Sequence, residues 1–276
     1  MSERFLENIA RGIKSKVNST FDNPYKKLNI NWLKLKYYKH LSGTRIRTHK
    51  LFGHAFYFSR PQELLHGLKE IFIDEIYRLK LEPDPFIIDC GANIGMSIIY
   101  VKQKYPSAEI LAFEPDDSNF SLLEKNISSF GYSGVQLHRK AVWDTNTVLK
   151  FSNESSMGSR VESSATSSTK DVKAVRLKDL MVRDVDFLKI DIEGAENVVL
   201  YDIADQLGRV KNMFLEYHGT FEQNKDLVNI LSIIETAGFN FYIKEAANIY
   251  NTPFARTKNP NTPYDVQLNI FCFRDI

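Results

Sequence analysis

Two pairs of polar side chains end apolar runs, and their types can move protons or bind a metal ion. Asp191 and Glu193 follow one run, and Glu216 and His218 close a later one. Both runs read as β-strands, in which residues two apart point to one face. Carboxylates with a histidine could hold Mg²⁺ or supply a general base. In an alternative interpretation, Asp191 and Glu193 only cap the helix that follows them.

An earlier segment could bind a ligand through its backbone. The apolar run that starts at Phe86 reaches an acid, a small-residue turn and then a helix-like segment. Glycines let such a turn bend sharply and let a ligand come close. We expect free N–H groups at the helix start to attract electron-rich ligand groups. The candidate ligand-binding residues of this segment are Asp89, Gly91, Ala92, Asn93 and Gly95.

The next apolar run, Glu109 to Phe113, also ends in an acid, Glu114, which Pro115 follows. An acid roughly 20 residues after such a loop is placed to accept hydrogen bonds from ribose hydroxyls. The loop itself lacks the G-x-G-x-x-G spacing of dinucleotide-binding proteins and the Lys-Ser/Thr pair of a Walker loop. Glu114 and Pro115 are therefore candidate residues for binding a nucleoside-containing cofactor.

Four short motifs carry a resemblance to a known family. The chain contains DCGANIG, AFEPD, LKIDIEGAE and LEYH in this order. From Phe86 to about Phe273 it resembles the FkbM-type methyltransferases. The resemblance implies an α/β, Rossmann-like class I methyltransferase fold, which is a mostly parallel seven-stranded sheet with an antiparallel C-terminal strand. It also implies S-adenosylmethionine as the cofactor.

The strand order that the resemblance implies brings the acids and the histidine together. In the class I order, the strands that lead to Asp191 and His218 are neighbours, so their polar side chains would line one cleft. The candidate catalytic residues are His218, as the general base because its side chain suits proton transfer near neutral pH, with Asp191 and Glu216. The alternative is a structural His218 that only closes the strand. Asp191 is also a candidate cofactor-binding residue. Mg²⁺ held by Asp191, Glu216 and His218 is an open alternative to a metal-free base.

Apolar periodicity predicts strands that alternate with helices, which indicates a parallel sheet covered on both faces. After the third strand, the resemblance puts Ala141, Val142 and Asp144 beside the adenine; the alternative is a β-turn with a packed tryptophan. A Ser/Thr-rich loop at 152–170 could be a substrate lid or a surface loop without a catalytic role.

Charge separates the chain into two parts. The composition is typical of a soluble globular protein, with 43% hydrophobic and 25% charged residues among 276. Through Arg60 the chain has 13 Lys/Arg and 3 Asp/Glu, whereas the remainder has 23 and 31. We therefore expect a basic N-terminal extension at 1–60, made of a helix and a hairpin, and a methyltransferase domain at 61–276.

The basic extension begins with an amphipathic helical pattern at 1–17. This helix could lie on an anionic membrane surface or pack on protein. The segment at 31–38 could be a strand or a short helix, and a hairpin is predicted to turn near Gly53. Basic and aromatic residues are interleaved here without an RNA-binding motif, so we expect no nucleic-acid partner.

Cys90 and Cys272 fall inside predicted strands and read as buried, reduced thiols. The sequence has no apolar stretch long enough to span a bilayer and no hydrophobic core of a signal peptide. The expected location is therefore the cytoplasm, including the inner face of the membrane if the basic extension binds there.

Together these features predict an S-adenosylmethionine-dependent O-methyltransferase. The resemblance implies an acceptor hydroxyl on a sugar, a polysaccharide or glycolipid precursor, or a related natural product. Two alternatives remain. One is a cofactor-binding module that has lost its chemistry, and the other is a nicotinamide-dependent oxidoreductase, against which the missing glycine pattern argues.

Overall fold

The computed structural model describes residues 23–152, 169–257 and 263–274. The chain divides into two compact units, Met1–Ile76 and Tyr77–Ile276, whereas the sequence predicted a division after Arg60. The predicted helix at 1–17 and residues 153–168 of the predicted Ser/Thr-rich loop lie outside the described residues.

The N-terminal unit combines short helices with one hairpin. Its elements are η1 (Pro24–Leu28), α2 (Trp32–His40), β1 (Arg47–Leu51), β2 (His54–Phe58), α3 (Pro61–Gly67) and the π-helical η2 (Leu68–Ile73). The predicted hairpin is confirmed, and it turns at Phe52 and Gly53. The segment that the sequence left open is a helix, because the Asn31 side chain accepts the Lys34 N–H and caps it. Buried His49 anchors the unit through the Leu28 carbonyl oxygen, 2.8 Å from its Nε2.

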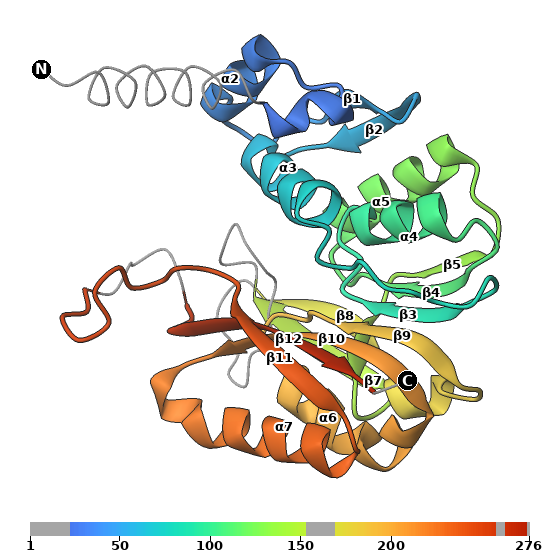
Figure 1. The fold of residues 1–276 in the computed structure, drawn as a ribbon, viewed down its shortest axis with the longest axis vertical. Helices are drawn as coiled ribbons and strands as arrows, with labels where there is room; N and C mark the ends of the chain where they lie inside the picture. The colour runs from blue at the N-terminus through green and yellow to red at the C-terminus, as the bar shows by residue number, and fades with distance from the viewer. Residues whose placement is uncertain (1–22, 153–168, 258–262, 275–276) are drawn as a thin grey trace, which may run out of the picture. The chain divides into compact units, whose positions relative to one another are not determined.

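A seven-stranded sheet forms the centre of the second unit (Figure 1). Its strands lie in the order β11-β12-β10-β9-β3-β4-β5, and only β12 is antiparallel to its neighbours. This is the mostly parallel sheet with an antiparallel C-terminal strand that the resemblance implied. The strands are β3 (Phe86–Cys90), β4 (Glu109–Phe113), β5 (Val135–His138), β9 (Val185–Ile190), β10 (Val210–Gly219), β11 (Asn240–Glu245) and β12 (Val266–Phe273).

Helices cover both faces of this sheet, as the alternating pattern predicted. Helices α4 (Met96–Lys104) and α5 (Asp117–Phe130) lie on one face, and α6 (Glu196–Ile203) and α7 (Asn224–Thr236) lie on the other (Figure 1). Because the central strands are covered on both sides, they read as continuous apolar runs, and all five residues of β3 are buried. The short 3₁₀ helices are η3 (Leu177–Leu180), η4 (Ala204–Arg209) and η5 (Phe221–Gln223).

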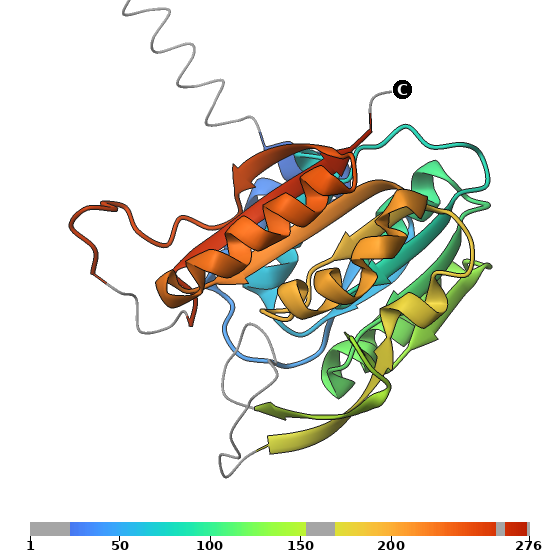
Figure 2. The ribbon, with the colours of Figure 1, turned by 90° about the horizontal axis from the view of Figure 1, so that it is seen from below.

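A second, three-stranded sheet follows β5. It has the order β6-β8-β7, with β6 (Ala141–Trp143), β7 (Thr147–Ser152) and β8 (Thr169–Arg176). Figure 2 shows β7 and β8 running together away from the main sheet. Both cysteines are buried and free, as expected. Within the described ranges, no helix is long and apolar enough to cross a membrane.

The chain order reverses between β3 and β9, which are parallel neighbours in the sheet. From β3 the chain proceeds outward to β4 and β5, whereas β9 leads to β10 on the other side. Loops at the carboxyl ends of strands on either side of such a reversal diverge and leave room for a ligand. The loops after β3, β4, β9 and β10 are therefore the candidate ligand-binding loops of this fold.

Candidate active site

The loop after β3 is held tightly by its neighbours. Gly91 and Gly95 have φ values of +91° and +92°, and Asn93 also has a left-handed φ of +49°. The N–H groups of Gly91 and Ala92 both donate to the Phe113 carbonyl oxygen, at 3.0 and 2.8 Å. These two N–H groups are therefore not available to a ligand, whereas the free N–H groups expected at the helix start belong to the first turn of α4. The hydrogen bonds instead fix the loop against the end of β4.

Glu114 is the buried acid of this loop system, with 6% of its surface exposed. One carboxylate oxygen accepts the Asn93 N–H and the other accepts the Asp116 N–H, both at 2.9 Å. Burial raises the pKa of Glu114 to about 7, against these two backbone hydrogen bonds. Each carboxylate oxygen retains a further lone pair, so Glu114 can still accept a ligand hydroxyl.

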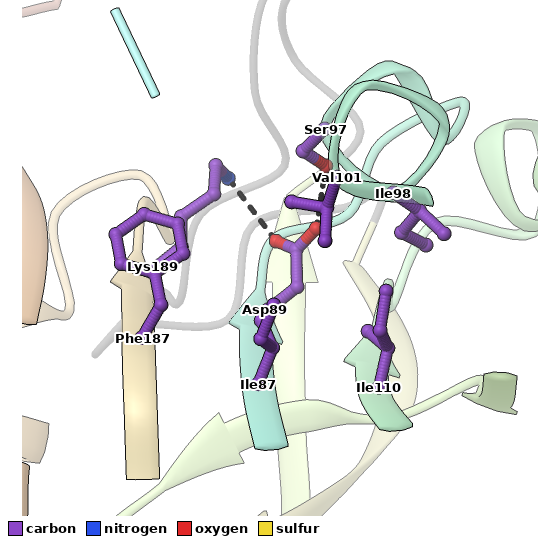
Figure 3. Close-up of a pocket in the computed structure, with 8 residues that line it drawn as sticks. All are labelled: Ile87, Asp89, Ser97, Ile98, Val101, Ile110, Phe187 and Lys189. Carbon is purple, nitrogen blue, oxygen red and sulfur yellow. Dashed lines mark hydrogen bonds and ion pairs between the residues drawn. The ribbon is translucent and has the colours of Figure 1, made fainter. Parts of the chain in front are cut away.

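A buried ion pair lies between β3 and β9. Asp89 and Lys189 are direct neighbours in the register of these strands, and their charged atoms are 3.4 Å apart. The other Asp89 oxygen accepts a hydrogen bond from the Ser97 hydroxyl at 2.5 Å. Figure 3 shows Asp89 between these two partners. The Lys189 ammonium also binds the Gly91 carbonyl oxygen at 2.7 Å and Asp191 at 3.1 Å.

The loop after β9 presents acids on a strained backbone. Glu193 has a left-handed φ of +59°, which is uncommon outside glycine and often marks functional loops. Helix α6 starts at Glu196 without a side-chain cap, so the capping interpretation of Asp191 and Glu193 is wrong. Buried Glu196 holds this loop instead, because its carboxylate accepts the N–H groups of Ile192 and Gly194.

His218, near the end of β10, is buried among three glutamates. Its Nδ1 lies 3.0 Å from Glu196, so it carries the hydrogen that a carboxylate can accept. Its Nε2 faces Glu216 at 3.5 Å and Glu193 at 3.8 Å. The Tyr264 ring packs on the imidazole, with centroids 4.9 Å apart, and its hydroxyl donates to the Glu193 carbonyl oxygen. The ring is thus fixed, with Nε2 toward the carboxylates.

The acids and His218 form one electrostatic unit. Burial alone would lower the pKa of His218, but Glu196, Glu216 and Glu193 raise it well above its usual value. Burial raises the pKa of Glu193 to about 8; the His218 charge opposes this rise, and the neighbouring carboxylates add to it. The titrations of His218 and Glu193 are therefore coupled to each other.

Asp191, Glu193 and His218 also have the arrangement of a cation-binding site. One ligand atom of each lies within 4.8 Å of the others. The sequence named Glu216 rather than Glu193 as the third ligand. Glu196 meanwhile binds Nδ1 of His218. A carboxylate on the second ring nitrogen is the usual support of a metal-bound histidine, so these residues fit a divalent cation.

Comparison with known proteins agrees with the sequence motifs. The family model described as the methyltransferase FkbM domain matches residues 89–241, more than half of the chain. The chain belongs to the FkbM methyltransferase family. Methyltransferase 1 of Beauveria bassiana (strain ARSEF 2860) is 31% identical over 205 residues, which cover 64% of this chain and 80% of that protein.

Two further proteins with the FkbM name are less similar to the chain than the Beauveria protein is. The 31-O-demethyl-FK506 methyltransferase FkbM of Streptomyces tacrolimicus is 24% identical over 211 residues, covering 62% of this chain and 80% of that protein. The crystal structure of methyltransferase FkbM from Methylobacillus flagellatus KT superimposes with a TM-score of 0.47 and 16% identity. That match covers 71% of this chain and 45% of the other.

Three predicted cofactor residues of this FkbM methyltransferase lie in or beside the second sheet. Ala141 and Val142 belong to β6, and their side chains are buried in apolar clusters. The segment is therefore a strand rather than the β-turn of the alternative interpretation. Asp144 follows it and is partly exposed. Ala141 and Val142 could contact a ligand through their backbone, whereas Asp144 offers its side chain.

Three residues at the site were missed by sequence reasoning. Lys189 is a charged residue inside an apolar strand, two residues before Asp191. A charge in such a strand needs a partner, and the expected strand order puts β3 with Asp89 beside it. Glu196 lies in the quoted motif LKIDIEGAE but was assigned no role. Tyr264 comes from the long connection between β11 and β12, and nothing local in the sequence points to its contact with His218.

Proposed function

We propose that this FkbM-family methyltransferase uses S-adenosylmethionine to methylate a hydroxyl of a sugar, a polysaccharide or glycolipid precursor, or a related natural product. One observation carries the proposal. The glycine loop after β3 and the acid–histidine cluster after β9 and β10 lie together at the carboxyl ends of these strands. Lys189 contacts both of them, through Gly91 and Asp191. Methyl transfer is an in-line displacement, so the placement of donor and acceptor is a large part of catalysis.

The loops after β3 and β4 form the proposed cofactor half. Ribose hydroxyls donate hydrogen bonds, and buried Glu114 can accept them beside Asn93. S-adenosylmethionine also carries positive charge on its sulfonium and ammonium groups, which the negative charge of Asp191 would favour. A nicotinamide cofactor is disfavoured because the loop lacks the glycine spacing that a pyrophosphate requires.

His218 is the proposed proton acceptor for the hydroxyl. A sugar hydroxyl is too weakly acidic to attack at neutral pH without a base, and a positioned base typically contributes about 10²–10⁴ in rate. Glu196 would orient the ring through Nδ1, leaving Nε2 for the proton. Because the glutamates raise the pKa of His218, this role requires positive charge to enter the site with the cofactor.

A divalent cation such as Mg²⁺ is the proposed alternative to a metal-free site. Asp191, Glu193 and Nε2 of His218 would hold it, since two carboxylates and an imidazole suit several divalent ions. The ion would polarise the acceptor oxygen as a Lewis acid. The S. tacrolimicus relative is named as a methyltransferase of 31-O-demethyl-FK506, which supports an oxygen acceptor in either arrangement.

The test is methyl transfer from S-adenosylmethionine with a labelled methyl group to a panel of sugars, nucleotide sugars and glycolipids. We expect a labelled methyl ether on at least one hydroxyl acceptor. Binding of the cofactor without product across the panel would instead support the inactive module. Repeating the reaction after chelation, with and without added Mg²⁺, separates the metal-assisted site from the metal-free one.

The charge of the N-terminal segment supports a further part of the proposal. The 13 Lys/Arg against 3 Asp/Glu through Arg60 would attract the chain to an anionic membrane surface. Membrane-linked acceptors such as glycolipid precursors would then be near the enzyme. We therefore propose peripheral contact at the inner face of the membrane.

A further inference from the structure

Buried Lys189 contacts the cofactor loop and the acid cluster at the same time. Only 5% of its side chain is exposed. Its ammonium lies 2.7 Å from the Gly91 carbonyl oxygen, 3.1 Å from the Asp191 carboxylate and 3.4 Å from the Asp89 carboxylate. These contacts join the loop after β3 to the loop after β9, and none of the chemical roles proposed above involves Lys189.

The ammonium has little freedom to move. Lys189 and Asp89 pair directly across β9 and β3, and the Ser97 hydroxyl fixes the other Asp89 oxygen (Figure 3). The cavity beside them leaves an accessible volume of about 10 Å³, which is room for about one water molecule. The residues that line it are Ile87, Asp89, Ser97, Ile98, Val101, Ile110, Phe187 and Lys189.

The two loops meet backbone to backbone at this point. A Cβ atom on Gly91 would lie 1.8 Å from the Asp191 carbonyl oxygen, and the Asp191 N–H donates to the Cys90 carbonyl oxygen at 3.1 Å. Two electron-rich groups, the Gly91 carbonyl and the Asp191 carboxylate, therefore converge near the ammonium. Without a positive charge between them they would repel each other and lose a hydrogen-bond donor.

We propose that Lys189 is a positioning residue that fixes the cofactor loop against Asp191 and so sets the cofactor site before the cofactor binds. It acts through Gly91 and Asp191 and does not touch the reacting atoms. The inference rests on the proposed function for the identity of the cofactor. Preorganisation of this kind lowers the cost of binding, because the loop does not have to be ordered by the ligand.

The chain offers a matched control in a second buried lysine of the same unit. Lys102 is 2% exposed, and its ammonium binds the carbonyl oxygens of Pro106 and Ala108 beyond the C-terminal end of α4. Lys102→Met and Lys189→Met each remove a buried ammonium that binds backbone carbonyls. Both variants should lower the unfolding temperature, but only Lys189→Met removes the link between the two loops.

The experiment measures S-adenosylmethionine affinity by calorimetry, and kcat and acceptor KM by methyl transfer, well below the unfolding temperature of each variant. We expect Lys189→Met to weaken cofactor binding at least tenfold with an unchanged acceptor KM. Lys102→Met should bind the cofactor like the wild type. Unchanged cofactor affinity in Lys189→Met, or an equal loss in Lys102→Met, would overturn the proposal.

If Lys189→Met does not fold, the cofactor affinities of two milder variants test the same proposal. Lys189→Arg keeps the positive charge, whereas Lys189→Gln keeps only a hydrogen-bond donor. A positioning charge predicts tighter cofactor binding by Lys189→Arg than by Lys189→Gln; equal affinities contradict it. A wild-type protein that fails to bind S-adenosylmethionine would instead refute the proposed function, so the two failures are distinguishable.

Discussion

At the residue scale, His218 and its glutamates carry the proposed chemistry. The histidine was predicted from its place at a strand end, yet the group that binds its Nδ1 is Glu196, which stands at the start of helix α6. A carboxylate in that position fixes both the tautomer and the orientation of the ring. The acid–base unit is therefore larger than the two pairs that the sequence suggested.

The first prediction concerns His218→Ala. As a base, His218 should matter for turnover and little for cofactor affinity, because cofactor binding uses the neighbouring loops. We expect near-normal S-adenosylmethionine binding and a fall in rate of about 10²-fold or more. His66→Ala is the control, because that histidine is exposed in the N-terminal unit. Wild-type turnover in the His218 variant would reject the role.

At the element scale, the loop after β3 depends on the absence of a side chain at Gly91. A larger side chain at Gly91 would fill space that a ligand needs, but the structure gives a nearer obstacle, the backbone of Asp191. Even one methyl group at Gly91 would force the two loops apart. The loop geometry and the chemistry at the end of β9 are thus interdependent.

The second prediction compares Gly91→Ala with Gly131→Ala. Both glycines have left-handed φ values, +91° and +66°, but a Cβ at Gly131 meets nothing within 4 Å. Gly131→Ala should therefore cost only the backbone penalty, about 1–2 kcal/mol in the free energy of unfolding. Gly91→Ala should cost more and should also weaken cofactor binding. Denaturant unfolding and calorimetry of both variants check this; equal costs with intact binding would contradict it.

The elements themselves were largely predictable from the sequence. The sheet could be read from apolar runs such as that of β3, because strands buried on both faces leave a strong pattern. Helix α2 could not be settled, because its periodicity is weak and its structure depends on the Asn31 cap and tertiary packing. The contacts of Lys189 and Tyr264 join residues 98 and 71 positions away, and only the folded sheet brings such partners together.

At the scale of the whole molecule, the stability of the N-terminal unit should depend on pH through His49. Burial lowers the pKa of His49 to about 4, so the folded N-terminal unit keeps this ring neutral. The unfolded chain gains a proton below pH 6.5, so stability should decrease as the pH falls from about 6.5 to 4. The expected slope is at most about 1.4 kcal/mol per pH unit.

Hydrogen exchange of backbone amides in residues 23–73 measures this effect in the full chain. His49→Gln should reduce the pH dependence, whereas His66→Gln, at an exposed site, should leave it unchanged. A pH dependence that persists in full in the His49 variant would show that another group is responsible.

The charge asymmetry gives a prediction for the intact chain at a membrane. Full-length protein should sediment with vesicles that contain anionic lipid at low salt. Because the attraction is electrostatic, it should weaken as the salt concentration rises and the Debye length shortens. Neutral vesicles are the control. No sedimentation with anionic vesicles at low salt would exclude docking of this kind.

The most direct test of the central claim is calorimetric titration of the wild type with S-adenosylmethionine and, in parallel, with NAD. We predict that only S-adenosylmethionine binds. Glu114→Ala should weaken its binding free energy by about 1–3 kcal/mol, the usual cost of a lost hydrogen bond to a charged group. Glu109→Ala, at the exposed start of the same strand, should bind normally. Binding of NAD instead, or unchanged affinity in a folded Glu114→Ala variant, would contradict the assignment of this cofactor site.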